Sequence, residues 1–235
     1  MQKLNIKLAD LNVQIEYNYD YMNNFCKEYI AQFDTPNIIA KTDSESILKE
    51  KELVPNAPIE SCESLCIYRS IGEQLPHFDR FVFHGAAIEY DNNAYLFTAP
   101  SGTGKTTHIN LWRKHLGDKV DIINGDKPII QVGHSSTVYG TPWAGKEGYQ
   151  RNTSAPLKAI CILKQGKINN IKQLEKSEAV NHLMRQVYLP HDPVSLSKTL
   201  NLLGTLIENV PVYMLECDIS QQAFETSFNQ MTKKP

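Results

Sequence analysis

The sequence predicts an α/β fold with a mixed sheet, and three observations support this prediction. Short apolar runs typical of buried strands recur over residues 80–217, and segments with helical spacing separate them without strict alternation. A glycine-rich segment at 99–107 follows one predicted strand and opens one predicted helix. The chain of 235 residues, 41% hydrophobic and 21% charged, has the length and composition of a globular protein with a sizeable core.

The charge balance and the apolar patterning exclude several classes of protein. Lys and Arg number 24 against 26 Asp and Glu, so the net charge of −2 lacks the basic excess of a dedicated nucleic-acid binder. No stretch approaches the ~18 apolar residues of a membrane-spanning helix, and the N-terminus does not resemble a secretory signal. The 5 cysteines, at irregular spacing, favour reduced thiols. We therefore expect a cytoplasmic protein with no nucleic-acid and no membrane partner.

The N-terminal part predicts a small β-rich lobe. Apolar residues alternate over 4–15 around a turn at Asp10, which predicts a hairpin. The polar, proline-containing stretch 34–58 is expected to join this lobe to the main body. Residues 1–58 would then be lobe and linker, and residues 59–235 the main domain. Folding of both parts as one unit is the alternative.

Apolar spacing predicts the other elements of the main body. In chain order these are a helix starting at Ser61 or Ser64, a β-hairpin within 80–98, a helix after the glycine-rich segment, strands at 120–123, 129–132, 138–139 and 156–164, helices at about 176–188 and 195–208, a strand at 210–217, and a last helix capped by Asp218.

The glycine-rich segment has the pattern of a P-loop. Small residues let successive backbone N–H groups turn toward a phosphate, and the start of the following helix adds partial positive charge. Lys105 is placed to reach the β- and γ-phosphates, and the hydroxyl of Thr106 is placed to bind Mg²⁺. The residues expected to bind nucleotide are Ser101, Gly102, Thr103, Gly104, Lys105, Thr106 and Thr107.

Two further residues are candidates for phosphate chemistry. Asp126 follows the next apolar strand, where P-loop proteins hold Mg²⁺ and where a kinase base accepts a hydroxyl proton. A simple turn aspartate is the alternative. His84 lies among apolar and small residues, a setting that by itself also fits a hydrogen-bonded core histidine. We expect His108, on the helix after the P-loop, to lie on the solvated face of that helix. A position near the nucleotide is the alternative.

The segment 139–152, YGTPWAGKEGYQRN, is too charged to be a buried strand. Trp143 could anchor it by packing. Lys146 and Arg151 could meet phosphate, and Glu147 could meet a metal or a substrate hydroxyl. An ordered surface crossover held by Trp143 is the alternative.

Three motifs, taken in order, resemble the core motifs of the superfamily of HPr kinase/phosphorylase and ATP-dependent phosphoenolpyruvate carboxykinase. They are His84-Gly85, the segment 101–107 and Gly125-Asp126. The resemblance covers residues 79–165 and is greatest to small HPr-kinase-related members, in which runs such as NGDKP and GTPWAGKEG recur. The signatures of Ras-type GTPases and of eukaryotic-type kinases are absent from the sequence.

This resemblance implies an ATP- and Mg²⁺-dependent kinase that phosphorylates a serine-type hydroxyl on a peptide, a protein or a small metabolite. It implies Lys105, His84 and Asp126 as catalytic residues, with Thr106 and Asp126 on the metal. HPr kinase itself has two adjacent aspartates where this chain has Gly125-Asp126, so either Asp126 serves both roles or Glu147 supplies the second carboxylate. A homo-oligomer is compatible with this prediction. A nucleotide-binding regulatory NTPase without a phosphorylated product is the alternative function.

Overall fold

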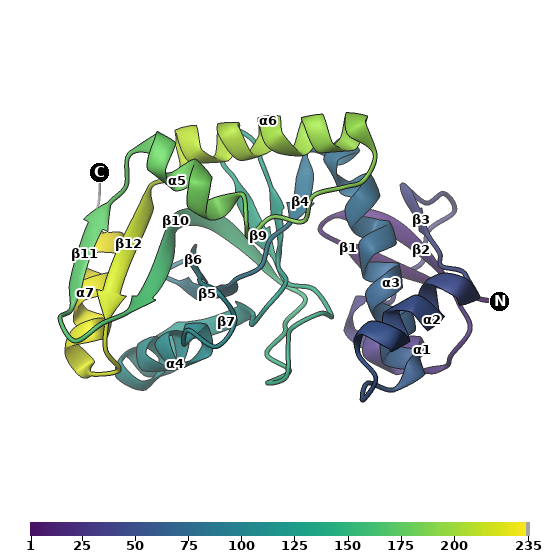
Figure 1. The fold of residues 1–235 in the computed structure, drawn as a ribbon, viewed down its shortest axis with the longest axis horizontal. Coiled ribbons are helices and arrows are strands. Elements are labelled where there is room, and N and C mark those ends of the chain that lie inside the picture. The colour runs from purple at the N-terminus through teal and green to yellow at the C-terminus, as the bar shows by residue number, and fades with distance from the viewer. Residues whose placement is uncertain (234–235) are drawn as a thin grey trace.

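The computed structural model describes residues 1–233 and has an α/β architecture with mixed sheets (Figure 1). A small sheet in the N-terminal part contains β1 (Gln2–Leu8), β2 (Leu11–Tyr17) and β3 (Ile38–Ala40). Strands β1 and β2 form the predicted antiparallel hairpin, with Ala9 and Asp10 in the left-handed region at the turn. Strand β3 pairs in parallel with β2.

The polar stretch 34–58 contains β3 and the helix α2 (Ser44–Leu53). Asp43 starts α2 by accepting a hydrogen bond of 2.7 Å from the backbone N–H of Ser46. Ile47 then packs on the buried thiols of Cys62 and Cys66. A good cap and one buried residue per turn are therefore enough to form a helix in a mostly charged segment.

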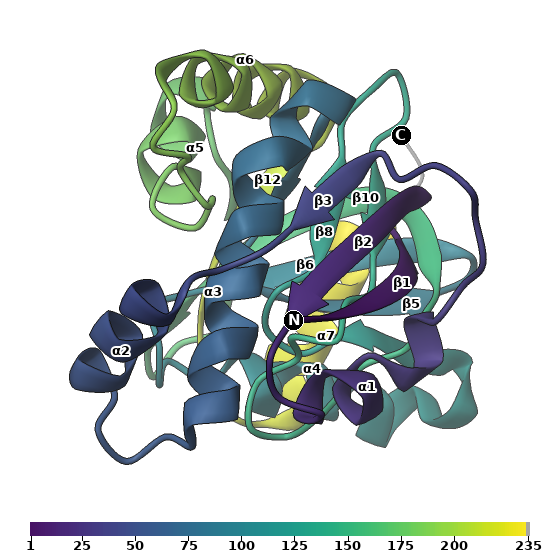
Figure 2. The same cartoon turned by 90° about the vertical axis from the view of Figure 1, so that its right-hand side faces the viewer.

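Two other helices complete the N-terminal part, the short α1 (Tyr21–Phe25) and the long α3 (Ile59–Gln74). Helix α3 begins before the predicted Ser61, with Pro58 at its N-cap. Figure 2 shows α3 running alongside the small sheet. Its buried face shares one apolar cluster with β1, β2 and the main body, since Ile67 and Ile71 pack together with Ile15 and Trp143. The division of the chain at residue 58 stays a prediction.

The larger sheet forms the centre of the main body. Its longest strand, β10 (Ser154–Gln165), pairs in parallel with β6 (Asn93–Thr98) and β12 (Val212–Cys217) and antiparallel with β9 (Thr137–Tyr139), which makes the sheet mixed as predicted. The strands that follow the N-terminal part are β4 (Arg80–Val82), β5 (Ala86–Tyr90), β6 (Asn93–Thr98), β7 (Val120–Asn124), β8 (Ile129–Gln131), β9 (Thr137–Tyr139), β10 (Ser154–Gln165), β11 (Asn170–Gln173) and β12 (Val212–Cys217).

The apolar run at 80–90 is two strands and not one. Strand β4 pairs with β8, whereas β5 forms a hairpin with β6 through Asp91 and Asn92, both at positive φ. Between β4 and β5 the backbone N–H groups of residues 83–85 bind carbonyl oxygens of three other residues, Pro128, Gln186 and Asp126. This crossing places His84 beside Gln186 and the turn at Asp126.

Helices cover both faces of the larger sheet. On one face lie α4 (Lys105–Leu116) and α7 (Gln221–Met231), whose side chains pack around the fully buried Trp112. On the other lie α5 (Lys176–Leu183) and α6 (Pro193–Asn209). Helix α5 ends earlier than predicted, and α7 has Ser220 at its N-cap where Asp218 was expected. Burial of an indole such as that of Trp112 contributes about 3 kcal/mol.

Two general expectations concern the whole chain. Within residues 1–233, every helix is too short or too polar to cross a bilayer. The five cysteines are free thiols, as their irregular spacing predicts, and four of them are buried.

Candidate functional site

A glycine-rich loop connects the end of β6 to the start of α4. Gly102 and Gly104 have φ values of 79° and 112°, the left-handed region that glycine adopts without steric cost. Gly104 is the N-cap of α4, and no side chain caps the helix. The first N–H groups of α4 are therefore available to an anion, and the helix dipole favours one there.

A cavity of about 410 Å³ lies at this loop, and we call it the loop cavity. Most of the residues that the sequence singles out line it together, although they come from distant parts of the chain. They are His84, Ser101, Gly102, Gly104, Lys105, Thr106, Thr107, Asp126, Lys146 and Glu147, with Gly125 and Gly145 beside them. The predicted nucleotide-binding residue Thr103 is not part of this lining and faces a neighbouring pocket.

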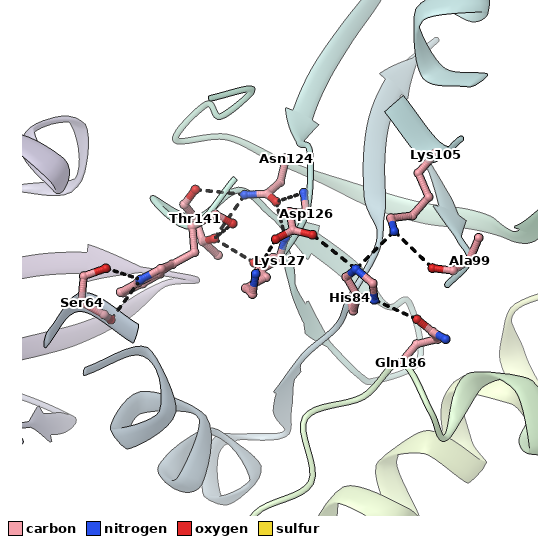
Figure 3. A network of polar contacts seen from close by, with 10 residues as sticks. Ser64, His84, Ala99, Lys105, Asn124, Asp126, Lys127, Thr141 and Gln186 are labelled. Atoms are coloured by element: carbon pink, nitrogen blue, oxygen red, sulfur yellow. Dashed lines mark hydrogen bonds and ion pairs between the residues drawn. The ribbon is translucent and has the colours of Figure 1, made fainter. Parts of the chain in front are cut away.

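Lys105 points into the loop cavity from the first turn of α4. Its Nζ donates to the carbonyl oxygen of Ala99 over 3.1 Å and lies 3.2 Å from Nε2 of His84 (Figure 3). Burial lowers the pKa of Lys105, and the nearby carboxylate of Asp126 opposes that shift. A partly desolvated cation of this kind gains from an anionic ligand more than an exposed lysine would.

His84 is held from both sides. Its Nδ1 lies 3.0 Å from Oε1 of Gln186, and its Nε2 lies 3.4 Å from Oδ1 of Asp126. Its backbone N–H also donates to the carbonyl oxygen of Gln186 over 2.6 Å. A neutral ring that donates from Nδ1 to Gln186 can accept from Lys105 at Nε2, whereas a hydrogen bond from Nε2 to Asp126 requires a proton on that nitrogen. Gln186 thus orients the ring, and no signal in the sequence points to it.

Asp126 follows β7 in a turn that Asn124 builds. The side-chain oxygen of Asn124 accepts from the backbone N–H groups of Asp126, at 2.9 Å, and Lys127, at 2.7 Å. Its amide donates to the carbonyl oxygen of Thr141 over 2.9 Å. Asn124 is fully buried and ties the turn to the segment after β9. The Asn-Gly-Asp order, typical of a side-chain-stabilised turn, is the signal that could have identified this role.

The carboxylate of Asp126 is strongly biased toward its charged form. Burial by itself would raise its pKa, but hydrogen bonds with His84 and Lys127, together with the charge of Lys127, lower the pKa to about 2. Lys127 forms an ion pair with it directly. At neutral pH this residue is therefore an anion suited to holding a cation or to accepting a hydrogen bond from a hydroxyl.

Residues 140–151 form an irregular loop that borders the cavity. Trp143 anchors it, since the buried indole donates to the carbonyl oxygen of Ser64 in α3 over 3.2 Å and packs edge-on against Phe25. Lys146 and Glu147 both line the loop cavity. Arg151 does not, because its guanidinium pairs with Asp121 at 2.5 Å on the outside of β7.

The expectation for His108 is wrong. It is buried, not solvated, with Nε2 3.0 Å from the hydroxyl of Ser227 in α7 and its ring beside Phe97. Burial lowers the pKa of His108 to about 4. The face of α4 that carries His108 packs against α7. Because α7 is far away in the sequence, the local pattern around His108 does not reveal this contact.

The residues of the loop cavity fit Mg²⁺ of the kind that accompanies a nucleotide. No cluster of three His, Cys, Asp or Glu side chains with the geometry of a protein-only metal site occurs within residues 1–233. Mg²⁺ at a nucleotide does not require one, because phosphate oxygens and water supply most of its ligands. Thr106 and Asp126, which line the same cavity, offer the hydroxyl and the carboxylate that would complete the set.

A second pocket, of about 360 Å³, adjoins the loop cavity and shares Gly102, Gly104 and Thr107 with it; we call it the side pocket. Gln165 lines it and donates to the carbonyl oxygen of Thr103 over 3.2 Å. Other lining residues come from the end of β10, from α4 and from the segment after β12, namely His108, Leu111, Leu163, Lys164, Gly166, Cys217, Asp218 and Ile219. The sequence did not indicate these residues as a site, because they lie on three separate elements.

Comparison with known proteins places this α/β chain in a family. The family model described as "SynChlorMet cassette protein ScmC" matches residues 63–232. The chain therefore belongs to this family. The matched region contains the whole loop cavity and the glycine-rich loop.

Among solved structures, the chain is similar to the Hpr(Ser) kinase/phosphatase from Coxiella burnetii. The identity is 9% and the TM-score 0.33, and the match covers 61% of this chain and 89% of that chain. A search of curated proteins finds no match.

Proposed function

We propose that the protein is an ATP- and Mg²⁺-dependent phosphotransferase that acts on a serine-type hydroxyl. One observation carries this proposal. The ionised carboxylate of Asp126 lies where the loop cavity meets a second, open groove, so it borders both a phosphate-sized site and a path for an acceptor. A site for nucleotide alone would not need this second opening.

Phosphate binding is supported by the glycine-rich loop, which we assign as a P-loop. The uncapped start of α4, the two left-handed glycines and the half-buried ammonium group of Lys105 converge on one cavity. Mg²⁺ held by Thr106 and Asp126 would supply charge neutralisation of the transferring phosphates. The lysine then stabilises the charge that develops on the phosphoryl oxygens.

Nucleoside binding is supported by the side pocket. Because it shares three loop residues with the loop cavity, a nucleotide with its phosphates on the loop can place its base and sugar there. Leu111, Leu163 and Ile219 offer apolar contacts to a base, and Asp218 offers an acceptor for a hydroxyl or an amino group.

In the proposed reaction the acceptor oxygen attacks the γ-phosphorus, and the bond from that phosphorus to the β,γ-bridging oxygen breaks. ADP leaves with the electron pair, and the hydroxyl proton passes to the carboxylate of Asp126 and then to solvent. A carboxylate with a pKa of about 2 is a weak base. Its main contribution is therefore to orient the hydroxyl, with proton transfer late in a loose transition state.

Incubation with γ-labelled ATP, Mg²⁺ and fractionated cell extract tests this function. We expect label in an acid-stable hydroxyl ester, and we expect Lys105→Ala to remove it. Release of labelled inorganic phosphate alone, with no labelled acceptor in any fraction, would favour the regulatory NTPase instead.

A further inference from the structure

The open groove next to the loop cavity lies between the N-terminal part and the main body. Its volume is about 720 Å³, larger than that of the loop cavity, and we call it the lobe groove. One wall comes from α1, the short 3-10 turn that follows it (Lys27–Tyr29) and α3, and the other comes from the turn after β7 and the loop 140–151. Its residues include Tyr21, Phe25, Lys27, Ser64, Asp126, Lys127, Trp143, Lys146 and Gln150.

The lobe groove continues into the loop cavity. Asp126, Gly145 and Lys146 line both spaces. Figure 3 shows Ser64, from the groove, and Lys105, from the loop cavity, on opposite sides of Asp126. A ligand in the groove can therefore present a hydroxyl at Asp126 while phosphates occupy the other side.

Aromatic side chains form the part of the groove contributed by α1. Tyr21 and Phe25 stack with ring centroids 5.2 Å apart, and Phe25 meets Trp143 edge-on at 5.7 Å. Tyr21 remains 37% exposed. These rings hold one another in place before any ligand arrives, so they offer a rigid apolar surface at small entropic cost.

The charge of the groove is opposite to that of the chain. Among the described residues, its lining contains Lys27, Lys127 and Lys146 and one carboxylate, that of Asp126, although the net charge of the chain is −2. Lys127 is paired with Asp126. Lys27 and Lys146 remain as cations with no ion pair among the described residues, and Lys27 does not line the loop cavity, so phosphate binding does not explain it.

We propose that the lobe groove binds the acceptor, and that this acceptor is an acidic peptide segment with a serine or threonine hydroxyl. The hydroxyl would reach Asp126, apolar side chains would pack on Phe25 and Tyr21, and acidic side chains would meet Lys27 and Lys146. The protein residues that would meet these groups lie on separate elements along an open groove. This spacing suits an extended chain better than a compact metabolite. The choice of acceptor rests on the proposed function, whereas the binding of an acidic peptide does not.

The test measures peptide binding in the absence of nucleotide, with fluorescence anisotropy as the readout. The probe is a short labelled peptide with a central serine, glutamates on both sides and one phenylalanine, and its counterpart has lysine at every glutamate. We expect the acidic peptide to bind at least about tenfold more tightly. Lys27→Glu should reduce that preference by about fivefold to tenfold, because the solvent-exposed attraction between Lys27 and the peptide's glutamates becomes a repulsion. Lys7→Glu, an exposed lysine on β1 outside the groove, should leave it unchanged.

Equal binding of the two peptides, binding of neither, or a preference that Lys27→Glu leaves unchanged would overturn the inference. Labelled ATP and Mg²⁺ then separate it from the proposed function. Tight acidic-peptide binding without phosphorylation would reject the kinase and keep the docking groove. Phosphorylation of free serine and of lysine-flanked peptides as readily as acidic ones would keep the kinase and reject the groove as an acidic-peptide site.

Discussion

Gly125 packs against the backbone of Ala144, and a Cβ atom at this glycine would lie 2.9 Å from the carbonyl oxygen of Ala144. The same Cβ would lie 3.3 Å from Cβ of Tyr149, whose carbonyl oxygen accepts from the N–H of Gly125 over 2.8 Å. The loop 140–151 therefore occupies the space that a side chain at this position would need. The second carboxylate that the resemblance to HPr kinase leads one to expect has no room beside Asp126, whereas Glu147 of the same loop does line the cavity.

Gly125→Asp should not create a better catalyst. We expect it to destabilise the protein by about 1–3 kcal/mol, because the loop backbone must move to admit the side chain. Gly133→Asp is the matched control, since its nearest neighbour would be 3.9 Å away. Thermal unfolding and nucleotide turnover of both variants check this. Higher turnover in Gly125→Asp without loss of stability would show that the loop is not packed as described.

Lys105→Ala should lower nucleotide-dependent turnover by roughly 10²-fold or more and leave the fold intact, because it removes a positioned charge from the phosphoryl group. Lys114→Ala, an exposed lysine on the same helix, is the control and should retain full turnover. Steady-state kinetics with circular dichroism measures both effects. Full activity in Lys105→Ala would contradict the assignment of the P-loop.

Asp126→Asn should keep ATP affinity within about tenfold and lower phosphoryl transfer by roughly 10²–10⁴-fold, because the neutral amide is a weaker acceptor for orienting the hydroxyl and cannot take its proton late in the transition state. Asp121→Asn controls for the loss of a charge at the start of the same strand, where the carboxylate pairs with Arg151 at the surface. Nucleotide titration and acceptor labelling separate binding from transfer. Normal transfer in Asp126→Asn would move the search for the base to Glu147.

Joint replacement of Lys146 and Glu147 by Ala and Gln should lower transfer to the acceptor much more than it lowers ATP affinity. Gly145 and Gly148, with φ values of 79° and 64°, flank these two residues. Gly145 lets the loop approach Asp126 closely, since a Cβ atom at Gly145 would lie 3.1 Å from Cβ of Asp126. We therefore treat the tip of this loop as a lid that excludes water from the reactants.

The measurement pairs nucleotide affinity with phosphate release in the presence and absence of acceptor. The control is the exposed pair on β11 and α5, changed as Lys172→Ala/Glu178→Gln. Hydrolysis without acceptor should not rise in the lid variant. Transfer that persists at the wild-type rate would leave the loop a structural crossover held by Trp143.

His108 should make the free energy of unfolding depend on pH in the acidic range. Its pKa is about 4 when folded and 6.5 when exposed, so the unfolded chain takes up the proton first as the pH falls. Stability is therefore complete above about pH 6.5 and is lost between about pH 6.5 and about pH 4, by up to about 3 kcal/mol.

Urea unfolding at about pH 7 and about pH 4.5 compares wild type with His108→Gln, whose amide can still bond to Ser227 but does not titrate. The variant should lose less stability over this interval than the wild type. His134→Gln, at an exposed histidine, should follow the wild type. Parallel pH dependence in His108→Gln would mean that other groups cause the acid loss.

The sequence by itself determined what depends on neighbouring residues. Alternation around Asp10 predicts the first hairpin, and the order of strand, glycines and lysine over 93–116 predicts the loop that starts α4. These features are local because turn geometry and helix starts are set by a few consecutive residues. The mixed sheet also followed from the irregular order of apolar runs.

The tertiary structure decided which distant residues meet. Gln186 orients His84 across 102 positions of the chain, and Trp143 is anchored on Ser64 across 79. His108 is buried because α7 covers it, and the lobe groove exists because α1 and α3 pack beside the turn at Asp126. Such contacts depend on how whole helices and sheets bury their apolar faces against one another, which local periodicity does not encode.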